Sequence, residues 1–144
     1  MDFSLSAEQQ GICDSVARIC AGFDDAYWLE RDTEGGFPQR FFDAIAADGW
    51  LGICIPEAYG GSGLGITEAA LMTGAIAQSG AGMSGASAVH MNIFGLNPVV
   101  QFGSEGEMAI LEFVGTALVK RAAERAKRRE ERLQALREGK ETEE

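Results

Sequence analysis

The sequence predicts an all-α protein, a small bundle of five or six helices with a long helix at its C-terminal end. Three observations lead to this prediction. Apolar residues recur three and four positions apart, as they do on one face of a helix. Residues that cap helices stand directly before these runs. Glycine-rich turns separate one run from the next.

The first three helices are predicted from their ends. Ser6 and Gln9 form a capping-box pattern before the first apolar stripe. Asp24 is placed to cap a short second helix, which extends to about residue 32. Pro38 suits the first turn of a third helix, because the missing N–H of proline costs nothing there. Gly49 suits the C-terminal end of that helix.

The pattern after the third helix is not helical. The apolar run 50–55 is too short for its period to decide between a buried strand and an extended core segment. A loop with glycines at positions 60, 61, 63 and 65 follows. Thr67 is then placed to cap a fourth helix, which is expected to extend to about Ser79.

Residues 69–104 contain no Asp, Glu, Lys or Arg, which predicts two helices that are buried on most sides. The glycines at 80 and 82 should separate them. The second of the two is expected from about Ser84 to Gly103, with Pro98 bending or shortening it. Serines, asparagines and glycines interrupt the segment too often for a membrane-spanning helix.

The last helix and the rest of the chain differ in charge. Ser104 and Glu107 form a second capping box, after which one long helix is expected. Residues 1–104 hold three basic and twelve acidic side chains, whereas residues 105–144 hold nine and ten, so the net charge is −10. This acidic balance argues against nucleic acid or an anionic membrane as the main partner.

The residues alone predict neither catalytic nor metal-binding constellations. The three cysteines include no C-x-x-C pair, which favours a reducing, cytoplasmic setting. The glycine loop matches neither the dinucleotide-binding nor the P-loop pattern. His90 has no carboxylate nearby in the sequence, so a histidine held in a core or an interface is favoured over a metal ligand. Asp24 and Asp25 are favoured as capping residues over an acid–base pair.

Several segments nevertheless carry a recognisable pattern. The most specific is 55–65, which contains Pro-Glu, two further residues and then Gly-Gly-x-Gly. The others are 3–10, 37–41, 49–53, 88–90 and 102–105. In this order they resemble the N-terminal helical domain of acyl-CoA dehydrogenases. The resemblance ends at about residue 105, so we expect a domain at 1–105 and a charged helical tail at 106–144 that is not family-like.

The resemblance implies a chemistry. Acyl-CoA dehydrogenases are FAD-dependent oxidoreductases that remove a proton and a hydride from adjacent carbons of an acyl-CoA thioester. An electron-transferring flavoprotein then takes the electrons. Family subunits also have a middle β-domain and a C-terminal helical domain and commonly form tetramers, so a homo-oligomer is implied. The C-terminal domain supplies the catalytic glutamate, so no residue of this chain is assigned as the base. The resemblance places part of the acyl pocket at Met83, Ser84, Ser87 and Met91.

Two functional interpretations follow. The first is a truncated, frameshifted or recombined acyl-CoA dehydrogenase that keeps the N-terminal domain and that, alone, neither catalyses the reaction nor binds FAD stably. The second is a non-catalytic interaction or oligomerisation module in which the tail helix contacts a partner.

Overall fold

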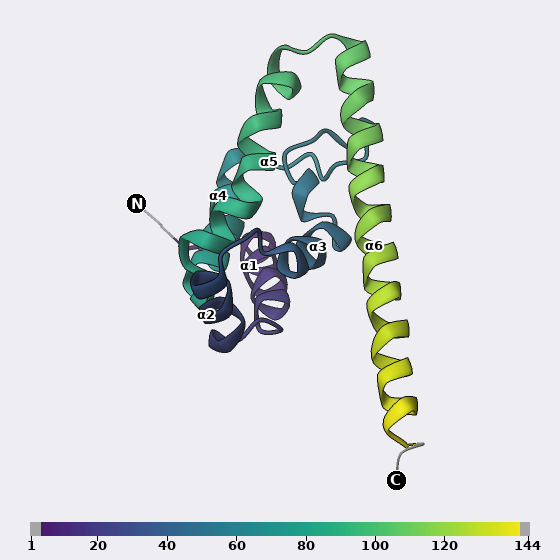
Figure 1. Cartoon of the computed structure of the whole chain (residues 1–144). Coiled ribbons are helices and arrows are strands. Elements are labelled where there is room, and N and C mark those ends of the chain that lie inside the picture. Colours follow the sequence, from purple (N-terminus) through teal and green to yellow (C-terminus); the bar gives the residue numbers. More distant parts are fainter. Residues whose placement is uncertain (1–3, 142–144) are drawn as a thin grey trace.

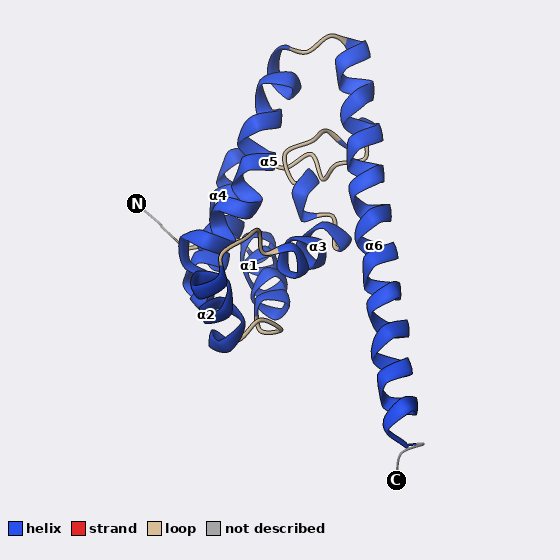
Figure 2. Ribbon diagram, viewed as in Figure 1, coloured by secondary structure: helices blue, strands red, loops and turns tan. Residues whose placement is uncertain are grey.

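The computed structural model describes residues 4–141, and within this range every regular element is helical (Figure 2). The α-helices are α1 (Ala7–Cys20), α2 (Asp25–Glu34), α3 (Gln39–Ala47), α4 (Ile66–Ile76), α5 (Gly82–Phe102) and α6 (Glu105–Glu141). Short 3₁₀ turns form η1 (Trp50–Gly52) and η2 (Glu57–Tyr59), and a π-helical turn forms η3 (Ala77–Ala81). The predicted all-α class is confirmed.

The predicted caps of α1 and α2 are present. Ser6 Oγ accepts a hydrogen bond from the backbone N–H of Gln9, and Gln9 Oε1 accepts one from the N–H of Ser6, each at 3.1 Å. Asp24 Oδ1 accepts from the N–H of Tyr27 at 3.0 Å. These side chains satisfy backbone donors that have no partner within their helices.

The start of α4 differs from the prediction. The helix begins at Ile66 with Gly65 as its N-cap residue, so Thr67 already lies inside the first turn. Glu68 performs the capping, because its Oε2 accepts from the N–H of Gly65 at 3.2 Å. Its Oε1 accepts from Gln9 Nε2 at 3.0 Å, which ties α4 to α1. The hydrogen bond from Gln9, with the backbone donors, lowers the pKa of the Glu68 carboxyl.

The run 50–55 is neither a strand nor extended, so that prediction is wrong. It forms η1 and a further turn, beginning at Gly49, whose φ is 81°. Leu51, Ile53 and Ile55 are all buried. The run therefore shows the alternating burial of a β-strand, although its backbone is not extended. The carbonyls of the run instead accept hydrogen bonds from the glycine loop, including Gly63 N–H to Ile55 O at 2.8 Å.

The core lies where α1, α3, α4 and the first half of α5 meet. Its fully buried side chains are Phe41, Ile45, Ile53, Met72, Ile76, Val16 and Val89. Trp28 of α2 closes one side, with its ring centroid 5.1 Å from that of Phe41 in an edge-on contact. Burial of this apolar surface is the main stabilising term of the bundle.

The predicted break between α4 and α5 is confirmed. Gly80 has a φ of 89° and Gly82 a φ of 53°, so the chain reverses and α5 returns along α4 (Figure 1). Pro98 does not shorten α5, which continues to Phe102. The second half of α5 is exposed rather than buried on most sides, and Phe94 and Phe102 are 69% and 89% exposed. None of the described helices is long and apolar enough to span a membrane.

The predicted long C-terminal helix is confirmed as α6. Its 37 residues extend over about 55 Å. Figure 1 shows α6 beside the bundle and continuing past it. Met108 and Leu111 are buried at its first turns, and further along Arg125 Nη1 donates to Asp43 Oδ1 of α3 at 2.8 Å. The helix is therefore attached to the bundle at two levels.

Candidate functional site

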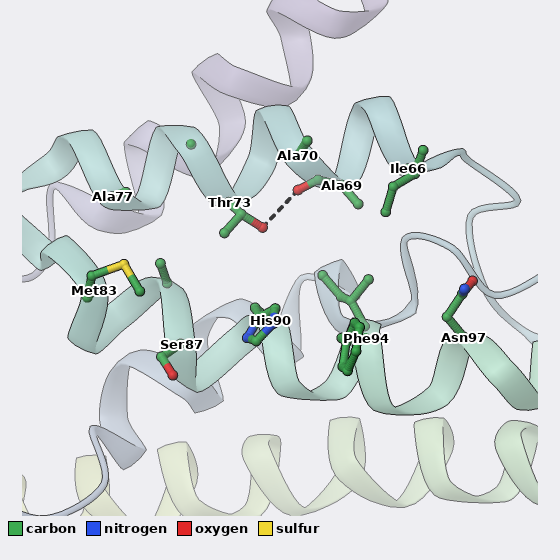
Figure 3. Close-up of a pocket in the computed structure, with 13 residues that line it drawn as sticks. Ile66, Ala69, Ala70, Thr73, Ala77, Met83, Ser87, His90, Phe94 and Asn97 are labelled. Atoms are coloured by element: carbon green, nitrogen blue, oxygen red, sulfur yellow. Dashed lines mark hydrogen bonds between the residues drawn. The ribbon is translucent and has the colours of Figure 1, made fainter.

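A groove of about 500 Å³ lies between α4 and α5 (Figure 3). Its walls come from two helices that follow each other in the chain and run in opposite directions. The lining residues are Ile66, Ala69, Ala70, Thr73, Gly74, Ala77, Met83, Ala86, Ser87, His90, Ile93, Phe94 and Asn97. None of them is Asp, Glu, Lys or Arg. This volume and this mainly apolar lining are typical of a small-molecule pocket.

The α4 wall is built from small side chains. Apart from Ile66 at the start of the helix, the lining positions of this wall are alanine, glycine and threonine, so the two helices leave open volume between them. Thr73 Oγ1 donates to the carbonyl of Ala69 at 2.8 Å, within its own helix (Figure 3). This hydrogen bond satisfies the hydroxyl donor internally, which keeps the wall apolar in character.

The α5 wall carries the larger side chains. Met83, Ser87, His90, Phe94 and Asn97 follow one another at spacings of four and three, so they share one helix face. The rings of His90 and Phe94 stack with centroids 5.7 Å apart and planes 26° apart. His90 is exposed at the groove rather than held in a core.

The structure places two of the four sequence-predicted pocket residues in this groove. Met83 and Ser87 line it, whereas Ser84 and Met91 do not. Ser84 and Met91 each follow a lining residue in the chain, and one residue turns a helix by about 100°. Ser84 Oγ donates instead to Asp32 Oδ1 of α2 at 3.5 Å. Met91 is exposed to solvent.

The α4 wall and the groove-facing side of α5 beyond Ser87 were not among the predicted site residues. A signal for them exists in the sequence. Ile66, Ala70, Thr73 and Ala77 repeat at four, three and four, and the α5 face repeats at the same intervals. When two consecutive helices form a hairpin, such stripes can face each other. If one of the stripes has small side chains, the pattern indicates a groove between the two helices.

The groove is suited to binding rather than to proton transfer. His90 is its one titratable lining residue, and no carboxylate or amine side chain lines it. Among the described residues, no group of three or more His, Cys, Asp or Glu is placed to hold a metal ion. The arrangement can therefore enclose an uncharged apolar chain, with Ser87 and Asn97 as polar contacts.

Two thiols outside the groove have unreactive settings. Burial raises the pKa of Cys20. Burial and then the nearby Glu68 carboxylate raise the pKa of Cys54, whose Sγ lies 3.6 Å from the carbonyl oxygen of Gly65. A raised pKa lowers the thiolate fraction, so neither cysteine resembles an activated nucleophile.

Comparison with known families matches residues 6–111 to the acyl-CoA dehydrogenase N-terminal domain. The chain belongs to the acyl-CoA dehydrogenase family. Benzylmalonyl-CoA dehydrogenase of Aromatoleum aromaticum is 34% identical over 89 residues, which are 62% of this chain and 24% of that protein. The probable acyl-CoA dehydrogenase YngJ of Bacillus subtilis is 32% identical over 107 residues, 73% of this chain and 27% of that protein. The matched region thus spans about a quarter of the length of these relatives.

One similar protein is not a dehydrogenase. The large ribosomal subunit protein bL17 of Solibacter usitatus is 64% identical over 42 residues, which are 29% of this chain and 28% of that protein. The comparison with solved structures gave no significant match.

Proposed function

We propose that the α4–α5 groove takes up the acyl chain of a CoA thioester, and that the protein family's FAD-dependent α,β-dehydrogenation is the reaction this groove serves. The observation that carries the proposal is the groove itself, with about 500 Å³ of space and no charged lining residue. An acyl chain gains about 0.8 kcal/mol for each methylene that it buries there. The membership of the family supports the choice of a thioester.

The residues of the two walls have different roles in this proposal. The small side chains of α4 determine how wide a chain can enter, because any larger residue would fill the space. Met83 and Phe94 of α5 contact the chain on the other side. Ser84 and Met91, outside the groove lining, contact the parts of the substrate that lie beyond it. All of these residues shape the pocket, and none of them removes a proton.

The groove does not fit FAD. The pyrophosphate of FAD requires cationic side chains or a cluster of backbone N–H donors, and the lining supplies no cation. We therefore propose that the 144-residue chain on its own neither retains FAD nor dehydrogenates acyl-CoA. Electron-transferring flavoprotein as the acceptor, a homo-oligomer and a cytoplasmic location stay predictions for the protein.

The test of flavin binding is direct. The purified chain is mixed with excess FAD, desalted and examined by visible absorption, and no flavin band should remain. Stoichiometric flavin, or reduction of an electron acceptor on addition of acyl-CoA, would contradict the proposal.

The groove is tested by calorimetric titration with saturated acyl-CoA thioesters of increasing length. Affinity should rise with chain length and fall in Ala70→Trp, whose indole occupies the groove. Losing three buried methylenes at about 0.8 kcal/mol each corresponds to a decrease of roughly fiftyfold. Ala109→Trp is the matched control, because Ala109 is exposed on α6 and does not line the groove. Equal affinities for the two variants would refute the groove as the acyl site.

A second candidate function concerns α6, as an interaction module. One of the similar proteins, the large ribosomal subunit protein bL17, is 64% identical to this chain over 42 residues. Residues 120–132 hold seven basic and three acidic side chains in a chain of net charge −10. The second candidate is therefore contact between α6 and the large ribosomal subunit.

This second candidate is tested by co-sedimentation with purified large ribosomal subunits. Binding should decrease in the double variant Arg121→Gln/Arg128→Gln and stay unchanged in Arg18→Gln/Arg31→Gln, which removes the same charge from α1 and α2. Absence of co-sedimentation for the parent chain at low salt, where charge contacts are strongest, would exclude it.

A further inference from the structure

The second half of α5 extends past the edge of the bundle and presents an uncovered apolar face (Figure 1). Met91, Phe94 and Phe102 are 59%, 69% and 89% exposed, and Gly95 and Pro98 between them are exposed as well. Met91, Gly95, Pro98 and Phe102 repeat at spacings of four, three and four, so they share one side of the helix, and Phe94 lies beside Gly95. We call these five residues the α5 face.

Gly95 is not required by the fold of the chain itself. It lies inside α5 with ordinary helical backbone, and a Cβ added there would meet nothing within 4 Å. Glycine in the middle of a helix is less stable than alanine. What glycine provides at this position is room beside Met91, Phe94 and Pro98, where a side chain from another molecule can insert.

The charge distribution favours a second copy of the chain as the partner. Residues 1–104 hold three basic and twelve acidic side chains, so two copies repel each other over most of the bundle. The α5 face lies within residues 69–104, which contain no Asp, Glu, Lys or Arg. Two copies can meet there without bringing like charges together, whereas a basic partner would gain nothing from an uncharged face.

The α5 face is complementary to itself when two α5 helices pair in antiparallel orientation. In a twofold contact, a residue that meets a second residue of the other copy is met by it in return. Phe102 follows Gly95 by about two helical turns, so pairing about Pro98 places Phe102 of each copy against Gly95 of the other. Each exposed ring then packs as a knob among four residues of the facing helix.

The antiparallel orientation also keeps the nearest acidic side chains apart. Glu105 begins α6 directly after the loop that ends α5. Pairing about Pro98 leaves the two Glu105 residues at opposite ends of the contact, roughly 20 Å apart at 1.5 Å per residue. Salt screens charges at that separation. A parallel pair would place the two carboxylates side by side.

We propose that the α5 face binds a second copy of this chain in an antiparallel twofold contact, with Phe102 of each copy packed against Gly95 of the other. At about 200 Å² for a whole aromatic side chain, the exposed parts of Phe94 and Phe102 contribute about 600 Å² from two copies. Stable interfaces bury about 1,200–2,000 Å², so this dimer is weak and reversible. Phe94 also lines the acyl groove, so the dimer contact adjoins that groove.

The test is sedimentation velocity of the full chain over a range of concentrations, which should show a reversible equilibrium between monomer and dimer. Phe102→Ala should weaken the dimer roughly a hundredfold, because two rings lose their contacts. Gly95→Leu should weaken it roughly tenfold, because the new side chain occupies the place of the ring. Leu29→Ala is the matched control, since Leu29 is 68% exposed on α2, and it should change the dimer affinity less than roughly twofold.

Gly95→Leu distinguishes a specific contact from general hydrophobic association, because the added leucine would strengthen the latter. The proposal is overturned if the parent chain stays monomeric at millimolar concentration or forms a continuous series of larger species. It is also overturned if Gly95→Leu leaves the dimer unchanged or tightens it, or if Phe102→Ala and Leu29→Ala cause equal losses. Circular dichroism verifies that each variant keeps its helical content, so a loss of dimer reports on the α5 face.

Discussion

Replacing Gly61 by alanine should disrupt the loop that packs on residues 52–56. An ideal Cβ at this position would lie 2.0 Å from the carbonyl oxygen of Ile55 and 2.5 Å from its carbonyl carbon. Both are backbone atoms, so no side-chain rotation relieves the contact. Real Cβ contacts shorter than 3.0 Å are not found, so the distance from the new Cβ to the Ile55 oxygen must increase by roughly 1 Å. The two segments must separate by about that much.

The cost follows from the hydrogen bonds that this separation breaks. The N–H groups of residues 61–64 donate to the carbonyls of Pro56, Gly52, Ile55 and Ile53 at 3.3, 3.0, 2.8 and 3.0 Å. Loss of two to four of these bonds, at about 1 kcal/mol each, gives a destabilisation of about 2–4 kcal/mol.

Urea denaturation followed by tryptophan fluorescence measures the free energy of unfolding. Gly11→Ala is the control, because Gly11 lies in α1 with open space around its Cα, and this change should stabilise the chain by about 0.5–1 kcal/mol. A loss below about 0.5 kcal/mol for Gly61→Ala, which is typical of an ordinary surface change, would refute the close-packing argument.

Three further outcomes are expected. Met72→Ala, which empties space at a fully buried position, should lower the free energy of unfolding by about 2–5 kcal/mol in the same urea assay. The lowered pKa of Glu68 means that its stabilising contribution is present above the unfolded value of 4.5 and is lost as the pH falls through the lower folded value. Glu68→Gln should therefore flatten the decrease of the melting temperature with acidification, and an unchanged slope would contradict this. Asp43→Asn should cost less than about 1 kcal/mol, because its partner Arg125 is 42% exposed, and a larger loss in thermal unfolding would mean that α6 depends on this ion pair.

The sequence predicted the fold most accurately where local chemistry decides the structure. Capping by Ser6 and Asp24 depends on a side chain and a backbone donor three residues away, so the pattern alone contains the information. The start of α4 depends partly on a distant contact, because Glu68 also accepts from Gln9 in α1. No local pattern contains that contact, and Thr67 was the better local candidate.

The candidate site was less predictable for a related reason. The spacing of Ser84 and Met91 puts them on one face of α5, but that face does not meet α4. Sequence spacing shows which residues share a helix face, whereas the packing of neighbouring helices decides which face lines the groove. The charge-free segment also suggested complete burial, whereas the second half of α5 lies past the edge of the bundle, where neighbouring helices leave it exposed. Composition thus predicted an apolar surface, and packing decided how much of it was covered.

The turn at Gly80–Gly82 has a consequence for how the groove forms during folding. Its two walls, 66–77 and 83–97, are consecutive in the chain, so bringing them together closes a loop of only a few residues. Contacts between near neighbours in sequence form quickly and lose little chain entropy. The groove can therefore assemble as soon as the hairpin of α4 and α5 folds, before α6 docks on α3. A change in the chain beyond Phe102 would leave this step of folding intact.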